Sequence, residues 1–165
     1  MPAFVSEIER KEILGYFFDR FGIPGSAFDG LRFLKEEKTL YAASDACRLE
    51  NILEKLRVEA VGVPLLRLDS SLWKPTAAGL RLFGKEASRN ILELDDNGLE
   101  ALLQQGGMDG PLPFDPGYVI LRWKGRILGC GLYGRRGLRS HIPEGRIIHL
   151  KRKDLPYAIE GEGSE

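Results

Sequence analysis

Two apolar runs in the last third of the chain limit its fold more strongly than any other feature. The runs YVILRW (118–123) and RILGCGLY (126–133) are joined by Lys124-Gly125, a pair typical of a tight hairpin turn. Both faces of each run are largely apolar, which is expected of strands in a small closed barrel and not of strands with one face in water. The sequence therefore predicts this hairpin as part of a small barrel.

The residues before the hairpin begin with a predicted small mixed α/β domain over 1–62. Ser6 and Glu9 have the spacing of a capping box, and apolar residues then recur at near-helical spacing. Further on, LRFLKEEKTLYAAS alternates around a charged turn. Three elements are predicted here: a helix over 6–21, a hairpin over 31–44 and a second helix over 45–56.

A change to short strands and many glycines predicts a second, β-rich domain over 63–153, and the acidic residues 154–165 are predicted to form a frayed tail. The fold class is therefore α+β. The further elements predicted are strands at 63–69, 90–96, 138–140 and 146–150, a short helix beginning at Pro75 and another over 99–105.

Charge is segregated along the chain although the net charge is zero. The segment 117–153 holds ten of the 24 Lys and Arg residues and one acidic residue, Glu144, whereas residues 1–116 hold 14 basic and 19 acidic residues. Basic side chains collected on one set of hairpins form a positive surface suited to a polyanion, of which RNA is the commonest soluble example. A solvated face balanced by acids elsewhere is the alternative interpretation.

The composition is ordinary for a globular protein, with 43% hydrophobic and 29% charged residues. No apolar run approaches the roughly 20 residues that a membrane-spanning helix needs. The first residues carry no apolar core of a signal peptide, so we expect a cytoplasmic protein. Cys47 and Cys130 are far apart in unlike contexts, which speaks against a disulfide framework or a zinc site, and we expect no cofactor and no metal.

Two glycine motifs resemble nucleotide-binding signatures without their required context. Residues 129–134 spell GxGxxG, but no helical pattern follows and 151–153 are basic where an acidic residue is needed. GLRLFGK (79–85) matches most of a phosphate-binding loop, but Glu86 stands where a hydroxyl should hold magnesium. We interpret the first as strand glycines and the second as a short helix ended by Gly84.

Cys130 has two histidines nearby in sequence, His141 and His149, and a thiolate nucleophile needs a neighbouring base. The spacing gives no support for catalysis. Cys130 alternates with Leu128 and Leu132, so the residues favour a buried thiol on one strand face. An enzyme that uses Cys130 remains a third hypothesis.

The segments KPTAAGLRLFGKEASRNILEL and GYVILRWKGRILGCGLYGRRGLRSHIPEG resemble the PUA-like RNA-binding domain fused to Sun-family RNA 5-methylcytosine methyltransferases. The preceding residues look like the small domain that often comes before PUA in these enzymes and in a PUA-containing factor of large-subunit ribosome maturation. The resemblance implies a PUA-like β pseudo-barrel that binds structured RNA along a groove formed by a helix and adjoining strands.

Nothing in the chain resembles the S-adenosylmethionine-binding domain of those enzymes, and neither cysteine follows the Pro or Thr that introduces their catalytic cysteines. We therefore expect a protein that is not an enzyme. The expected function is binding of structured rRNA or tRNA, in ribosome biogenesis and rRNA processing or in tRNA modification beside a separate methyltransferase. The alternative is a protein-interaction adapter that docks a ribosomal protein or a methyltransferase.

The expected RNA contacts are basic residues that can hold phosphates, because guanidinium groups match phosphate oxygens in a planar fork. Arg135, Arg136 and Arg139 lie on a predicted glycine-flanked turn and the strand after it. Tyr133 or His141 is a candidate for stacking on an unpaired base. The other candidates are Arg122, Lys124, Arg126 and Arg146, which extend the positive surface, and Lys74 and Lys85, which bracket the short helix that the resemblance assigns to the groove.

Overall fold

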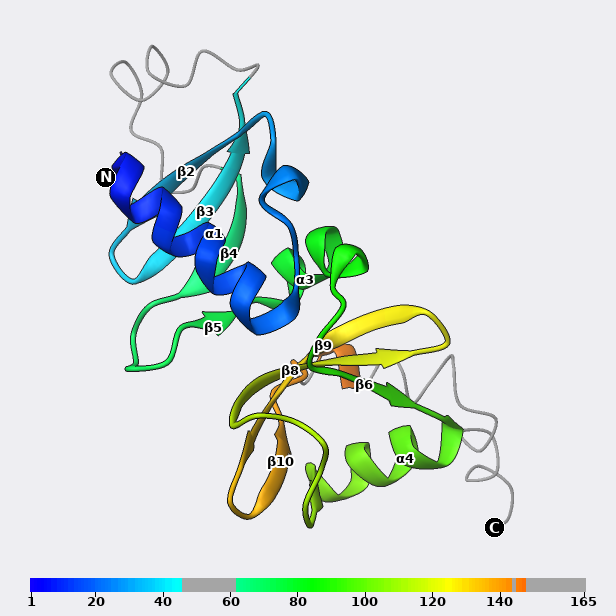
Figure 1. Ribbon diagram of the computed structural model, residues 1–165. Coiled ribbons are helices and arrows are strands. Elements are labelled where there is room, and N and C mark those ends of the chain that lie inside the picture. The colour runs from blue at the N-terminus through cyan, green and yellow to red at the C-terminus, as the bar shows by residue number, and fades with distance from the viewer. Residues whose placement is uncertain (46–61, 144, 148–165) are drawn as a thin grey trace, which may run out of the picture. The chain divides into compact units, whose positions relative to one another are not determined.

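The computed structural model describes residues 1–45, 62–143 and 145–147, and within them the chain forms two compact units, Met1–Ile91 and Leu92–Glu165 (Figure 1). Two five-stranded sheets and several short helices make this an α+β protein. The expected fold class is confirmed at this level. The predicted helix over 45–56 and the tail over 154–165 fall outside the described residues, apart from Asp45.

The sheet of the first unit has the order β1-β2-β3-β4-β5, so each strand pairs with its neighbour along the chain. Figure 1 shows helix α1 lying across this sheet. The strands are β1 (Ala3–Phe4), β2 (Leu31–Glu36), β3 (Thr39–Ser44), β4 (Val63–Arg67) and β5 (Lys74–Pro75). The helices are α1 (Glu7–Phe21), η1 (Gly25–Phe28), α3 (Ala77–Phe83) and η2 (Gly84–Glu86).

Helix α1 confirms the predicted capping box. Ser6 Oγ accepts a hydrogen bond from Glu9 N at 3.2 Å, and Glu9 Oε2 accepts one from Ser6 N at 2.8 Å. Ser6 N and Ser6 Oγ both donate to the Glu9 carboxylate, and because these two bonds favour its ionised form they hold the pKa of Glu9 below its usual value. The helix ends at Gly22, whose φ of +67° is the left-handed conformation that glycine adopts without strain.

The segment that leaves the first unit is fastened to the C-terminal turn of α1. The backbone N–H groups of Ser88 and Arg89 both donate to Phe21 O, and the Arg89 guanidinium donates to Phe18 O at 2.7 Å. Asn90 Nδ2 donates to Arg20 O at 2.6 Å. The two N–H groups and the Asn90 amide thus satisfy the carbonyl groups of Phe21 and Arg20, which the helix end leaves without helical partners, and Arg89 adds a second donor to Phe18 O.

The structure divides the chain after Ile91, whereas the sequence predicted a boundary after residue 62. Strand β4 pairs with β3 in the register Leu40↔Leu66, and β5 pairs with β4, so the first sheet continues past residue 62. Leu65 and Leu66 are fully buried in this unit. Helix α3 begins at Ala77 and not at Pro75 as predicted, because Pro75 pairs in β5 and Thr76 Oγ1 caps the helix by accepting a hydrogen bond from Gly79 N. The helix ends at Gly84, as predicted.

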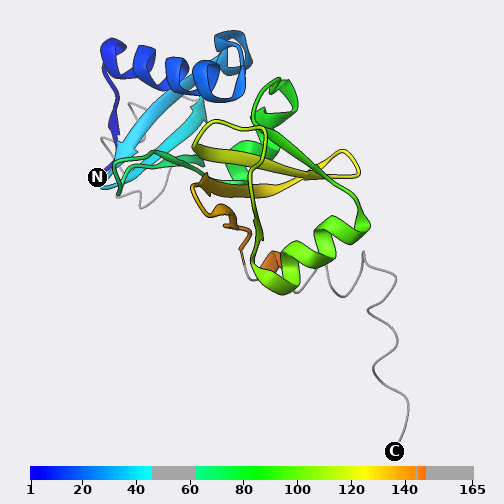
Figure 2. The same ribbon diagram turned by 60° about the horizontal axis from the view of Figure 1, so that its bottom comes forward.

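The sheet of the second unit has the order β6-β8-β9-β10-β7 and is curled. Its strands are β6 (Ile91–Leu94), β7 (Gly107–Asp109), β8 (Gly117–Trp123), β9 (Arg126–Gly134) and β10 (Gly137–Ser140), and its helix is α4 (Asp96–Gln105). Helix α4 lies along the curled sheet and contributes Leu99 and Leu102 to its core (Figure 2). The predicted β8–β9 hairpin is confirmed, with Lys124 and Gly125 at φ of +47° and +72° in its turn.

A β-bulge changes the expected environment of Cys130. Leu121 pairs with Gly129 and Arg122 with Ile127, so Leu128 is an extra residue on β9. Leu128 therefore belongs to the core that contains Leu121, whereas Cys130 pairs with Ile120 on the opposite face. Cys130 is buried as predicted, but it does not share a face with Leu128.

The strand predicted over 146–150 is wrong where the structure describes it. Residues 145–147 are helical, because the N–H groups of Arg146 and Ile147 both donate to Pro143 O. Residues 148–150 lie outside the described part of the chain. The strand predicted over 138–140 is confirmed as β10.

Candidate nucleic-acid interface

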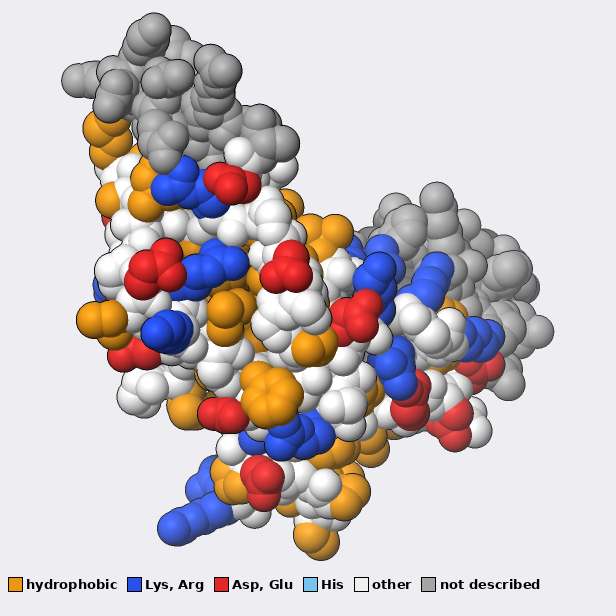
Figure 3. Space-filling view, turned by 45° about the horizontal axis from the view of Figure 1, so that its top comes forward, with side chains coloured by type: hydrophobic (Ala, Val, Ile, Leu, Met, Phe, Trp, Pro, Cys, Tyr) orange, Lys and Arg blue, Asp and Glu red, His pale blue; other side chains and the backbone are white. Residues whose placement is uncertain are grey.

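Two of the candidate basic residues already have acidic partners within the second unit. Arg122 on β8 donates a charge-assisted hydrogen bond to Glu93 on β6, and Lys124 Nζ lies 3.3 Å from Asp96 Oδ1 at the start of α4. Figure 3 shows acidic and basic side chains interspersed on the face that it displays. Arg122 and Lys124 therefore present less free positive charge than the sequence indicated.

Asp96 links the β8–β9 hairpin to α4. Its Oδ1 accepts a hydrogen bond from Trp123 Nε1 at 2.8 Å, and this bond, assisted by Lys124, holds the pKa of Asp96 below its usual value. The Trp123 ring is buried, and Lys124 and Arg126 lie over it at 4.7 and 5.4 Å from the ring centroid. These two cations thus cover the tryptophan and hold the hairpin tip in place.

Arg135, Arg136 and Arg139 differ from this group. Arg135 and Arg136 form the turn between β9 and β10, Arg139 is on β10, and all three are exposed. Within the described residues, none of the three takes part in an ion pair or a side-chain hydrogen bond. The structure therefore brings together, on one hairpin, the three arginines that the sequence analysis placed first.

The strand pairing shows which face of the sheet Arg139 occupies. Leu138 pairs with Met108 of β7, and both pack into the core of the unit. Because side chains alternate along a strand, Arg139 projects to the opposite, outer face, together with its cross-strand neighbours Gly107 and Leu132. The same alternation places Asp109 on the outer face.

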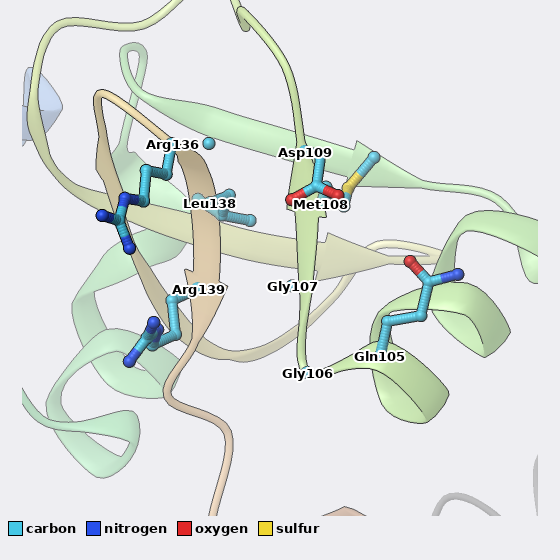
Figure 4. A pocket seen from close by; sticks show the side chains of 9 residues that line it. Gln105, Gly106, Gly107, Met108, Asp109, Arg136, Leu138 and Arg139 are labelled. Atoms are coloured by element: carbon cyan, nitrogen blue, oxygen red, sulfur yellow. The ribbon is translucent and has the colours of Figure 1, made fainter.

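A hollow of about 270 Å³ lies where β7 meets β10. Two glycines allow the two strands to approach: a Cβ on Gly107 would lie 2.4 Å from Leu138 O, and one on Gly137 would lie 2.2 Å from Met108 O. Figure 4 shows Arg136 and Arg139 extending on the same side of the β9–β10 hairpin. The lining residues are Gln105, Gly106, Gly107, Met108, Asp109, Arg136, Gly137, Leu138 and Arg139. Open backbone, two arginine residues and one aspartate thus line a single recess.

The aromatic candidates are part of the scaffold. Tyr133 is half-buried, its hydroxyl accepts a hydrogen bond from Leu112 N at 2.9 Å, and its ring meets Phe114 edge to face. His141 donates its backbone N–H to Cys130 O and meets the Tyr118 ring edge to face. These contacts account for both rings as packing, so stacking on a base is not needed to explain them.

The remaining candidates do not line the hollow. Lys74 on β5 and Lys85 on η2 belong to the first unit, where Lys74 is half-buried and Lys85 is exposed. Arg146 is half-buried in the helical residues 145–147, and its Nε is buried without a hydrogen-bond partner among the described residues. The structure thus separates the predicted RNA contacts into a hairpin group and several residues placed elsewhere.

Sequence reasoning missed the part of the hollow that carries no positive charge. Asp109 and Gln105 line it, and Gly107 leaves backbone open, but these residues lie in QQGGMDG, which has no clear period. The two adjacent glycines after the helical pattern were the available signal. They indicate a helix end followed by a close backbone approach.

Comparisons of this chain with models of known protein families and with curated proteins found no match. In the described residues, no cluster of three or more His, Cys, Asp or Glu side chains could hold a metal ion. None of the described helices combines the length and apolar character needed to cross a lipid bilayer.

Proposed function

We propose that this chain is a non-catalytic RNA-binding protein that holds structured rRNA or tRNA through Arg135, Arg136 and Arg139. The observation that carries the proposal is three exposed guanidinium groups on one hairpin, free of ion pairs within the described residues, beside a hollow with open backbone. Each guanidinium can donate two parallel hydrogen bonds to one phosphate. Such contacts fix the position of an RNA backbone.

The setting that we propose is a PUA-like β pseudo-barrel acting in the cytoplasm, in ribosome biogenesis or in RNA modification beside a separate methyltransferase or ribosomal protein. The curled sheet with its central apolar hairpin and α4 supports the barrel. The resemblance of 74–94 and 117–145 to the Sun-family domain supports the setting. The proposed role needs no cofactor: the protein binds the RNA and holds it in position.

The burial of Cys130 supports a role without catalysis. Its exposed fraction is 2%, and a thiolate nucleophile must be reachable by its substrate. The thiol lies within a strand pair, opposite Ile120. We therefore assign Cys130 to packing.

A second candidate function is a protein-interaction adapter, and one observation in the first unit favours it. Ile8 and Phe18 lie on α1 and are 73% and 53% exposed, so two large apolar side chains of this helix are accessible to a partner. A ribosomal protein or a methyltransferase with a complementary apolar face is the partner that this candidate requires. RNA binding would then be secondary.

The test is binding of the purified protein to structured RNA across a salt series. Neutralisation of about three phosphates should give a slope of log affinity against log salt of roughly −2 to −3. The Arg135/Arg136/Arg139→Glu variant should lose this binding. A Lys11/Lys35/Lys38→Glu variant changes the net charge equally at exposed positions of the first unit and should retain most of it.

Binding that survives in the arginine variant, or that does not depend on salt, would contradict the proposal. Far-UV circular dichroism of both variants would establish that they are folded. If only association with a protein partner responds to Ile8→Ser and Phe18→Ser, the adapter function would be favoured.

A further inference from the structure

We infer that the hollow between β7 and β10 takes one unpaired nucleotide of the bound RNA, and that Asp109 reads its base in favour of guanine. This inference rests on the proposed RNA binding and adds base selection to it. Its starting point is a carboxylate in a recess whose other charged groups are arginines.

The position of Asp109 follows from the strand register. Asp109 pairs with Gly137 and Gly107 pairs with Arg139, so all four residues share the outer face. Asp109 and Arg139 are diagonal neighbours there, at a Cα separation of about 7–8 Å. Asp109 is exposed and, within the described residues, takes part in no ion pair and no hydrogen bond through its carboxylate.

A carboxylate makes this hollow a poor site for phosphate alone, because like charges repel at this range. An ionised carboxylate can only accept hydrogen bonds, so it needs a ligand with N–H or O–H donors. The arginines need an anion. A nucleotide meets both needs: its phosphate is an anion for the arginines, and its base edge, on the other side of the sugar, can offer N–H donors to the carboxylate.

The size of the recess favours one nucleotide and not a duplex. About 270 Å³ is slightly below the roughly 300–1,000 Å³ of pockets that hold drug-sized ligands. A base enters such a recess only when it is unpaired and unstacked, which is also the state in which proteins read RNA bases on their Watson–Crick edge.

Guanine fits the chemistry of Asp109 best among the four bases. Its Watson–Crick edge presents two adjacent donors, N1–H and the N2 amino group, which can meet the two oxygens of one carboxylate. Uracil presents one donor between two carbonyl oxygens that repel a carboxylate. Adenine and cytosine each present one amino donor beside a ring nitrogen that can only accept.

The experiment uses four RNA hairpins with the same stem and a uridine loop, in which one loop position is G, A, C or U. The wild-type protein should bind the guanine hairpin about tenfold more tightly than the uridine hairpin, since a good bidentate base contact discriminates by roughly 1–3 kcal/mol. Asp109→Asn should reduce this ratio to below about threefold. The affinity of the Asp109→Asn variant for the uridine hairpin should stay the same or rise, because the substitution removes a negative charge.

The control is Asp69→Asn, which removes the same charge at an exposed site of the first unit and should leave the ratio unchanged. Equal affinities of the wild type for all four hairpins, with binding still dependent on Arg139, would overturn the base selection and leave the proposed RNA binding intact. Base selection by Asp109 would likewise be overturned if Asp109→Asn raised all four affinities equally and kept the preference. Absence of binding to every hairpin and to total structured RNA would overturn both proposals.

Discussion

Trp123 Nε1 donates a hydrogen bond to Asp96 Oδ1 at 2.8 Å, which ties the tip of the β8–β9 hairpin to the first turn of α4. This bond and Lys124 lower the pKa of Asp96 in the folded protein. The stabilisation is therefore fully present above the unfolded pKa of about 3.9 and is lost as the pH falls through the lower, folded pKa. Urea unfolding should show wild type more stable than Asp96→Asn at pH 6, with the gap closing below about pH 3.5. A gap that does not depend on pH would show that the ionised carboxylate is not the source.

Gly137 should tolerate alanine poorly. Its φ is +112°, and a Cβ would lie 2.2 Å from Met108 O on the neighbouring strand, so Gly137→Ala forces β10 and β7 apart. We expect a loss of about 2–4 kcal/mol in the free energy of unfolding, measured by urea denaturation. Gly134→Ala is the matched control on β9, because a Cβ there meets nothing within 4 Å, and it should change the stability by less than about 1 kcal/mol.

Asn90 should contribute through both its side chain and its backbone conformation. It has a φ of +53° and donates to Arg20 O, so Asn90→Ala loses a hydrogen bond and places alanine in the left-handed region. The expected loss is about 2 kcal/mol in the free energy of unfolding. Asn90→Gly loses the bond but keeps the conformation, and it should lose only about half as much. Equal losses in the two variants would argue against a role of the conformation.

Substitutions of Arg122 and of Arg139 should differ in their effects on RNA affinity and on its salt dependence. Arg139→Gln removes a free cation and should reduce the magnitude of the salt slope by about one unit at most, with weaker binding to every RNA. Arg122→Gln removes a cation that Glu93 already balances, so it should leave the slope nearly unchanged. Fluorescence anisotropy of a labelled RNA measures both, and the opposite ranking would show that Glu93 does not shield Arg122.

The sequence predicted correctly those local structures that depend on residues close together along the chain. The capping box of Ser6 and Glu9 and the turn at Lys124-Gly125 involve contacts over three residues or fewer, so local patterns predict them. The boundary predicted after residue 62 differs from the observed one because β3 and β4 pair across an intervening segment of the chain, which no local pattern reveals.

The candidate site was predictable only in part for the same reason. The concentration of arginines at 135–139 is visible in the sequence, and the structure places them on one exposed hairpin. The acidic partners of Arg122 and Lys124 lie 29 and 28 residues away in the sequence, on β6 and α4. The sequence alone therefore did not show that the positive charges of Arg122 and Lys124 are balanced. Strand β7 has three residues and two neighbouring glycines, which give no period from which Asp109 could be placed.

The attachment of 88–90 to the end of α1 also determines how the chain responds to proteases. Proteases usually cut native proteins at loose connections, where the backbone can enter the active-site cleft. Arg89 offers an exposed side chain that trypsin recognises, but its N–H is held by Phe21 O and β6 begins two residues later, at Ile91. Trypsin should therefore not cleave at Arg89 in the folded protein. Limited proteolysis at this junction will not yield the two units as separate intact fragments.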